Sequence, residues 1–320
     1  MDPWTKTHLW EFNVAESMKV MDIVMDLRVW VISAILLSLL IDTIDVPSST
    51  LIIVVLMVQM TLSMDGLKLS LNDMREYNRD AILSILLTYV LNTAVTIAIG
   101  TLFLPFNESI WYGWVILASM PCAIAVVMAA VITQENIEVA FVGVSATYVI
   151  GIAVTPLLSF ALIGDAVNPL EILKYLILFI VIPLILSRPL GRLKLARTVK
   201  VPIINAMMFI MIFLSVNSNR GYLLDEPMFI ATLLAVVVLR VLVLTALTKL
   251  VLTTAKVQND RWTMQTVMGV WKNTGLSVSM CMLLLASTPQ SVIPCFMSMM
   301  VECIWFSFVT RKKSQAHTTV

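Results

Sequence analysis

Apolar residues are gathered in long continuous runs along the chain, and short polar links separate these runs. A helix needs roughly 20 apolar residues to cross the hydrocarbon core of a bilayer. Because lipid cannot pair stray backbone groups, and because the runs do not alternate between polar and apolar positions, they predict helices rather than a barrel. We expect ten spans, at 27–43, 50–66, 80–104, 110–132, 137–163, 169–187, 199–217, 227–252, 262–286 and 289–309.

The basic residues predict the orientation of these spans, since Lys and Arg gather on the cytoplasmic side of a membrane. With ten spans, seventeen of the 21 basic residues fall on one side, and only Arg220 falls in a link on the other. We therefore expect both termini in the cytoplasm, with 1–26 as a lead-in and 310–320 as a tail. The expected location is the cell (plasma) membrane.

The ten spans divide into two halves of five, 27–163 and 169–309, which match in order and approximate length. An odd number of spans in each half gives the halves opposite orientations, as in the inverted repeats of many transporters. The fourth span of each half is irregular: Pro121 interrupts one, and Lys272 lies at the centre of the other. Two interrupted spans at corresponding positions point to a transport site.

The centre of the ninth span, Met-Gly-Val-Trp-Lys-Asn-Thr-Gly, is unusually polar for a membrane segment. An ionisable side chain at mid-membrane costs at least ~3 kcal/mol, so Lys272 is expected to face a cavity or a partner. Asn273 and Thr274 can pair with freed backbone groups or bind a solute. Gly269 and Gly275 would permit a turn and a close helix crossing. The alternative is a kinked helix whose lysine reaches one membrane surface.

Arg240 and Glu302 are a second candidate pair of intramembrane charges. Each lies thirteen residues after a proline that opens its span, Pro227 and Pro289, and both spans run inward from the same surface. The two side chains are therefore at similar depth and can form an ion pair. The alternative is that each reaches the inner interface alone.

Composition narrows the class of protein. The chain is 59% hydrophobic and 13% charged, with a mean hydropathy of +0.94, whereas soluble domains carry about 25% charged residues. An enzyme is not expected, since the histidines, His8 and His317, lie at the chain ends and no catalytic motif occurs. No cofactor, metal site or nucleic-acid partner is indicated. The four cysteines fall inside spans, which favours apolar packing over disulfides.

A family resemblance rests on Pro121 in the fourth span and on Lys-Asn-Thr-Gly-Leu at 272–276 in the ninth. Together with the segment from Pro121 through Thr155-Pro156-Leu157-Leu158, they resemble the bile acid:sodium symporter family. The resemblance implies an all-α membrane protein of ten transmembrane helices, in which the broken helices four and nine cross. It also implies a panel domain of spans one, two, six and seven, a core domain of the rest, and alternating access for an organic anion.

Several positions depart from the family pattern. Apolar side chains stand where the family has oxygen ligands for sodium: Val126, Val127, Ala140, Val144 and Met268. Hydroxyls remain nearby at Ser145 and Thr147, and Lys272 stands where the family has a glutamine. Sodium needs several oxygen ligands, so both sodium sites are expected to be lost. Lys272 could replace a bound cation, give an anionic solute a counter-charge or release a proton; alternatively, it is purely structural.

The expected function is therefore a secondary transporter of a small organic anion, with the solute and the lipid bilayer as partners and with protons as a further possible partner. Cys122, directly after Pro121, resembles the Pro-Cys of arsenite efflux permeases, where a thiolate could meet a soft metalloid. Metalloid efflux is thus one alternative. A membrane sensor or scaffold that transports nothing is another.

Overall fold

The computed structural model of the chain describes residues 21, 23–44, 48–65 and 71–316. Most of the expected lead-in and the end of the expected tail lie outside the described residues, as do the basic residues Lys6, Lys19 and Lys68. Within the described ranges the secondary structure is helical and contains no sheet. The predicted helical class is therefore confirmed.

The helices follow the predicted spans closely. In chain order they are α2 (Leu27–Leu40), α3 (Ser48–Ser63), α4 (Leu71–Glu76), α5 (Asn78–Ile85), α6 (Thr93–Gly100), α7 (Glu108–Ser119), α8 (Ala125–Ile132), α9 (Ile137–Ile163), α10 (Pro169–Leu176), α11 (Ile182–Arg192), α12 (Arg197–Ser218), α13 (Arg220–Asp225), α14 (Pro227–Thr254), α15 (Trp262–Val270), α16 (Thr274–Leu284) and α17 (Ile293–Ala316). Short π-helical or 3₁₀-helical segments join some of them: η1 (Leu86–Asn92), η2 (Thr101–Phe103), η3 (Gly164–Ala166), η4 (Ile177–Val181), η5 (Asn259–Arg261) and η6 (Pro289–Val292).

Six continuous helices in the described residues are long and apolar enough to cross a membrane. The chain is thus a multi-pass membrane protein. Two of the six, Asn78–Phe103 and Pro169–Arg192, contain the π-helical segments η1 and η4, which the apolar pattern did not predict. A π-helical turn widens the helix locally and is frequent at functional sites.

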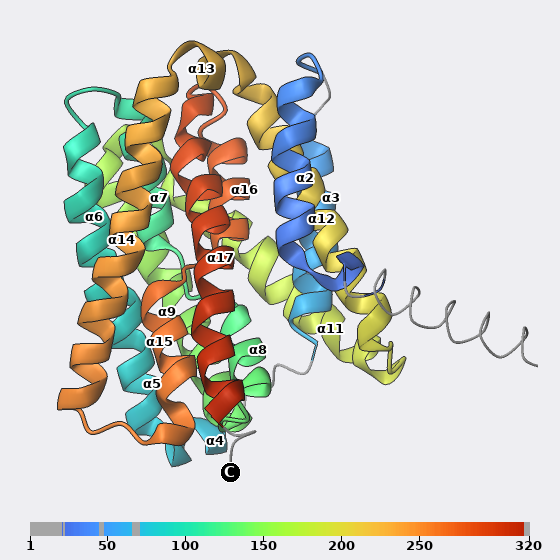
Figure 1. The fold of residues 1–320 in the computed structure, drawn as a ribbon, viewed down its shortest axis with the longest axis vertical. Helices are drawn as coiled ribbons and strands as arrows, with labels where there is room; N and C mark the ends of the chain where they lie inside the picture. Colours follow the sequence, from blue (N-terminus) through green and yellow to red (C-terminus); the bar gives the residue numbers. More distant parts are fainter. Residues whose placement is uncertain (1–20, 22, 45–47, 66–70, 317–320) are drawn as a thin grey trace, which may run out of the picture.

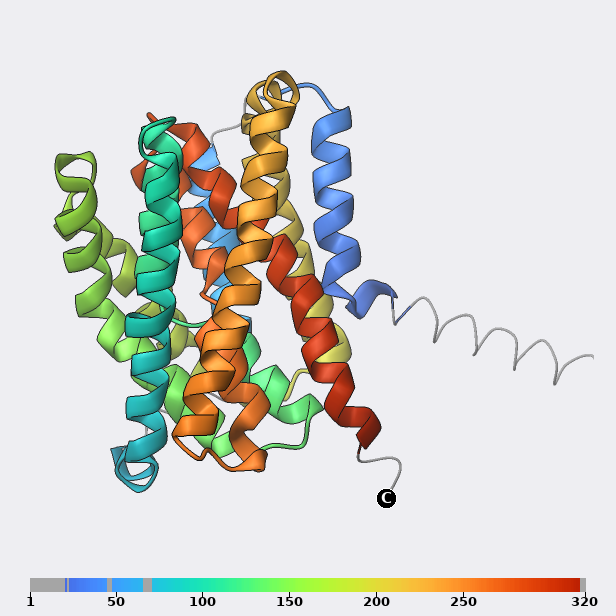
Figure 2. The same ribbon diagram turned by 60° about the vertical axis from the view of Figure 1, so that its left-hand side comes forward.

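The helices pack in two groups. Helices α2, α3, α11 and α12 contact one another on one side of the molecule, at the right in Figure 1. Helices α5, α6, α7, α9, α14 and α15 pack together on the other side. Helices α16 and α17 contact both groups, and Figure 2 shows α17, in red, inclined between α14 and α2.

The two interrupted spans lie at the centre of the larger group, and the helices that lead to their breaks are buried over most of their length. Residues Gly113–Ser119 of α7 and Thr263–Val270 of α15 are all buried. Both helices therefore end among buried residues, where their last carbonyl groups need partners.

Both predicted breaks are confirmed. Helix α7 ends at Ser119 and α8 begins at Ala125, because Pro121 has no N–H to continue the helical hydrogen bonds. Helix α15 ends at Val270, and α16 begins after Asn273. The Asn273 side-chain oxygen accepts a hydrogen bond from the Leu276 amide at 3.0 Å, which is the capping role this residue type favours.

The two glycines beside the second break differ in their surroundings. A Cβ atom on Gly269 would lie 2.5 Å from Thr248 Oγ1 and 2.7 Å from Thr248 Cγ2, so α15 approaches α14 closely there. A Cβ atom on Gly275 would have its nearest neighbour, Met208 Cε, at an ordinary 3.5 Å. The expected close approach is therefore right for Gly269 and wrong for Gly275, which borders a cavity instead.

The variant Gly269→Ala should lower the free energy of unfolding by about 1–3 kcal/mol, because overpacking forces neighbours to shift. Thermal unfolding of the purified protein in detergent would measure this loss. Adding Thr248→Ala should restore stability, since it removes both close atoms. Gly275→Ala is the matched control and should unfold like the wild type; equal losses for the two glycine variants would contradict this account.

Candidate functional site

The extended segments of the two breaks pair with each other at the centre of the molecule. They form an isolated antiparallel bridge between Cys122 and Lys272. Its hydrogen bonds run from Ala123 N to Trp271 O (3.0 Å) and from Asn273 N to Pro121 O (2.8 Å). The interrupted spans thus cross at their breaks, and we call this region the crossing.

The Lys272 ammonium lies beside the crossing and is completely buried. It donates hydrogen bonds to Thr88 O at 2.7 Å, to Met120 O at 2.8 Å and to Thr93 Oγ1 at 3.1 Å. An ammonium has three donors and no acceptor, so each of its hydrogens has a partner. The Tyr89 ring, 4.8 Å from Nζ, adds a cation–π contact. The alternative in which Lys272 reaches a membrane surface is wrong.

The carbonyl groups at the end of α7 have no partners within their own helix. Side chains supply the donors: Thr93 Oγ1 to Ala118 O (2.8 Å), Thr155 Oγ1 to Ser119 O (2.7 Å) and Lys272 Nζ to Met120 O. Because the ammonium can only donate, the Thr93 hydroxyl accepts from Lys272 and uses its own hydrogen for Ala118. The Asn273 amide of the bridge donates to Pro121 O, so every carbonyl from Ala118 to Pro121 has a donor.

The carbonyl groups at the end of α15 are paired in the same way. The Asn92 amide nitrogen donates to Gly269 O at 3.0 Å and to Val270 O at 2.9 Å, and Thr88 Oγ1 donates to Met268 O at 3.4 Å. The bridge supplies the donor for the next carbonyl. Every carbonyl from Met268 to Trp271 therefore has a protein donor.

Most of these donors come from the third span, the continuous helix Asn78–Phe103. They were not predicted from the sequence. Thr88, Asn92 and Thr96 are spaced four residues apart, which places them on one face of a helix. With Thr93 they form what we call the polar stripe of the third span, and all four side chains are buried. The four-residue spacing of polar residues within an apolar span is the sequence feature from which this polar face could have been predicted.

Arg240 and Glu302 form an ion pair with an Nη1–Oε1 distance of 2.9 Å, and both side chains are completely buried. The alternative in which each reaches the inner interface alone is therefore wrong. Arg240 also donates to Thr96 Oγ1 at 2.9 Å and to Ser298 Oγ at 3.4 Å. The pair thus contacts the polar stripe rather than standing apart from the crossing.

Glu135 fixes the other end of α15 and was likewise not singled out. Its carboxylate, in the link between α8 and α9, accepts hydrogen bonds from the backbone amides of Thr263 at 2.8 Å and Met264 at 2.7 Å. These amides belong to the first turn of α15, where a negative charge is favoured. The two broken spans are therefore connected at two places. One is the bridge at the crossing, and the other is the contact between Glu135 and the first turn of α15.

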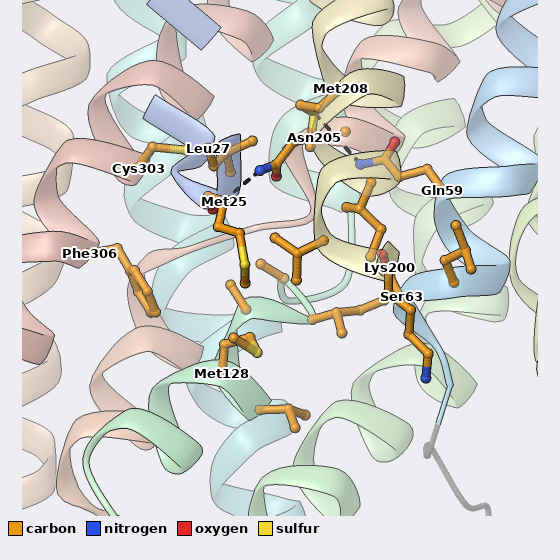
Figure 3. A pocket seen from close by; sticks show the side chains of 18 of the residues that line it. Met25, Leu27, Gln59, Ser63, Met128, Lys200, Asn205, Met208, Cys303 and Phe306 are labelled. Atoms are coloured by element: carbon orange, nitrogen blue, oxygen red, sulfur yellow. Dashed lines mark hydrogen bonds between the residues drawn. The ribbon is translucent and has the colours of Figure 1, made fainter. Parts of the chain in front are cut away.

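A cavity of about 750 Å³ borders the crossing at Ala123, Trp271 and Asn273. Its walls come from α3, α8, α12 and α17, and Asn273, Thr274 and Gly275 line it at the start of α16. Figure 3 shows its predominantly apolar lining, including Met128, Met208 and Phe306. Pro121, Cys122 and Lys272 do not line this cavity, so the structure divides the expected site residues into two sets.

The two cavity residues next to the bridge have structural contacts as well. The Asn273 amide nitrogen donates to the Tyr148 hydroxyl at 2.5 Å. The Trp271 indole N–H lies 3.5 Å from Thr274 Oγ1. A solute in the cavity would therefore meet polar groups that the crossing holds in place.

Charged side chains border the far part of the cavity. Lys200 is paired with Asp65, and Arg28 is paired with Asp26. Arg197 is exposed and forms no ion pair with any residue the structure describes. The cavity border thus carries one more positive than negative side chain, a balance that suits a negatively charged ligand.

Cys122 is buried, and its Sγ atom lies 3.1 Å from Thr147 Oγ1. Two further thiols, those of Cys281 in α16 and Cys295 in α17, lie 3.7 Å apart. The described residues contain no group of three His, Cys, Asp or Glu side chains that could hold a metal ion. Among the residues that the structure describes, the metalloid alternative is therefore left with a single thiol at the crossing, that of Cys122.

We expect Glu135→Ala to lower stability by about 1.5–3 kcal/mol, the usual value of a charge-assisted hydrogen bond. Thermal unfolding in detergent would measure the change. The control is Glu138→Ala, three residues along the chain, whose exposed carboxylate accepts a hydrogen bond from the Tyr77 hydroxyl. Finding the larger loss in the Glu138 variant would show that the α15 amides do not depend on Glu135.

Two comparisons with known proteins bear on these observations. The family model described as "Sodium Bile acid symporter family" matches residues 50–226, more than half of the chain. The match includes the first break and the polar stripe, and it ends before α14. No curated protein matches the chain.

Proposed function

Because this chain belongs to the sodium bile acid symporter family, we propose that it is a secondary transporter that moves a small organic anion without bound sodium. As a membrane transporter of this family it is not an enzyme. The observation that carries the sodium-free proposal is the Lys272 ammonium, which has three oxygen acceptors at the crossing within 3.1 Å.

Lys272 is proposed to act as a fixed cation. A bound sodium ion would be surrounded by oxygen atoms, and Nζ already has carbonyl oxygens from two helices and a hydroxyl around it. At the positions where the family resemblance implies sodium ligands, Val126 and Met268 are buried and apolar. The ammonium thus provides a permanent charge that needs no ion to be recruited.

The cavity supports an organic anion as the solute. Its apolar walls suit a hydrocarbon body, while the excess basic charge at its border and the amino-terminal end of α16 suit a carboxylate or sulfonate group. Lys272 would act on such a solute only at a distance, since its side chain does not line the cavity. Asn273 and Thr274 are the proposed direct contacts.

Alternating access is proposed to occur between the two groups of helices, because the cavity lies between α3 and α12 on one side and α8 on the other. An inverted repeat is supported by the links that follow the broken spans. Glu135, after α8, caps α15, and Gln290, after α16, accepts a hydrogen bond from Asn107 at the start of α7. Cytoplasmic termini remain part of the proposal.

Uptake into proteoliposomes over a panel of organic anions, with arsenite included, would test the function. We expect saturable uptake of at least one anion, unchanged when choline replaces sodium on both sides. Strict sodium dependence would contradict the fixed-cation proposal. Arsenite flux that Cys122→Ser abolishes would favour the metalloid alternative, and a complete lack of flux would favour a sensor or scaffold.

Lys272→Met should abolish uptake and lower stability by roughly 2–5 kcal/mol, because it leaves the buried Met120 carbonyl without its donor and removes one donor from Thr88 O. The matched control is Lys174→Met in α10, an exposed lysine away from the crossing, which should retain both uptake and stability. Uptake rates and midpoints of thermal unfolding would be measured for both variants. A Lys272→Met protein with wild-type uptake would rule out an essential fixed cation.

A further inference from the structure

Two carbonyl oxygens at the end of α15 converge on a single point, and Asn92 occupies it. Gly269 O and Val270 O lie 3.0 and 2.9 Å from the same Asn92 amide nitrogen. Oxygen atoms that converge in this way are the arrangement a small cation binds. In this chain, an N–H donor stands at that point instead.

The orientation of the Asn92 amide follows from the groups around it. A guanidinium can only donate, so the Thr96 hydroxyl accepts from Arg240 Nε at 2.9 Å and must direct its hydrogen elsewhere. That hydrogen goes to Asn92 Oδ1 at 2.9 Å, which turns the NH₂ group toward α15. Donation therefore runs from Arg240 to Thr96 and from Thr96 to Asn92, and this fixes the orientation of the Asn92 amide.

The bonds that hold this arrangement are all inside the protein. Arg240, Thr96, Asn92 and Glu302 are completely buried, and Glu302 holds the guanidinium at 2.9 Å. They come from α14, α6, η1 and α17. Because α14, α6 and η1 belong to the same packed group as α15, movement of the smaller group of helices need not break these bonds.

We infer that Asn92 supplies a second fixed donor in place of a cation at the crossing, and that Arg240 is the positioning residue that orients the Asn92 amide through Thr96. The inference rests on the proposed sodium-free function and extends it to the α15 end of the crossing. A latent cation site follows from it. Replacing the amide nitrogen by oxygen would complete a set of ligands made of two carbonyls and a carboxylate.

Asn92→Asp tests the inference without any solute. The full-length protein in detergent would be unfolded thermally in 100 mM sodium, potassium or choline chloride. We expect the wild type to unfold at the same temperature in all three. The Asp variant should gain at least about 3 °C in sodium over choline, as a site that is mostly filled would produce. Asn92→Leu removes the donor without adding a ligand and should show no sodium effect.

Thr96 tests the positioning role separately. Thr96→Val interrupts the bonds between Arg240 and Asn92 but leaves the Arg240–Glu302 pair, so the amide can turn and the carbonyls become available. We expect this variant to gain a sodium-specific rise in unfolding temperature, and Thr96→Ser, which keeps the hydroxyl, to show none. A purely structural role of Thr96 would lower the unfolding temperature equally in all three salts and would overturn the assignment of Arg240.

The outcomes separate the inference from the proposed function. A sodium response in the wild type would contradict the sodium-free function itself. Equal responses of Asn92→Asp and Asn92→Leu would contradict the inference alone. Failure to find a transported anion would leave these unfolding measurements unaffected.

Discussion

The pairing of backbone carbonyls at the crossing is the constraint on which the rest of the structure depends. Two helices end among buried residues in the membrane-spanning part of the protein, where each unpaired carbonyl costs several kcal/mol. Protein donors meet this requirement completely: the bridge between the breaks, the Lys272 ammonium, the polar stripe of the third span and Thr155. The carbonyl groups at the ends of both broken helices therefore all have protein donors.

The same constraint explains why charged residues lie so deep in an apolar protein. A buried charge is costly unless hydrogen bonds and opposite charges surround it. Lys272 has three oxygen acceptors, and Arg240 has Glu302 together with two hydroxyls. Both cations contact the polar stripe, which links them to the two breaks. The charges and the donors thus form one continuous network at the crossing, and neither Lys272 nor Arg240 lines the solute-sized cavity.

How far the sequence predicts this structure depends on the kind of contact. Long apolar runs predicted the helices, and Pro121 and the polar centre of the ninth span predicted the breaks, because these signals are local. The π-helical segment η1 and the role of Asn92 were not predicted, since they depend on which helices meet in space. Gly275 illustrates the same limit. Both glycines lie beside the second break, but Gly269 lies against α14 whereas Gly275 borders the cavity.

The central claim is that Lys272 remains a charged, fully hydrogen-bonded ammonium at the crossing whether or not sodium is present. Nitrogen NMR of the ¹⁵N-lysine-labelled protein in bilayers tests it most directly, with Lys272→Arg used to assign the signal. The account predicts an ammonium signal coupled to three protons at neutral pH, unchanged when sodium replaces choline. A neutral amine, or a signal that shifts as sodium is added, would contradict it.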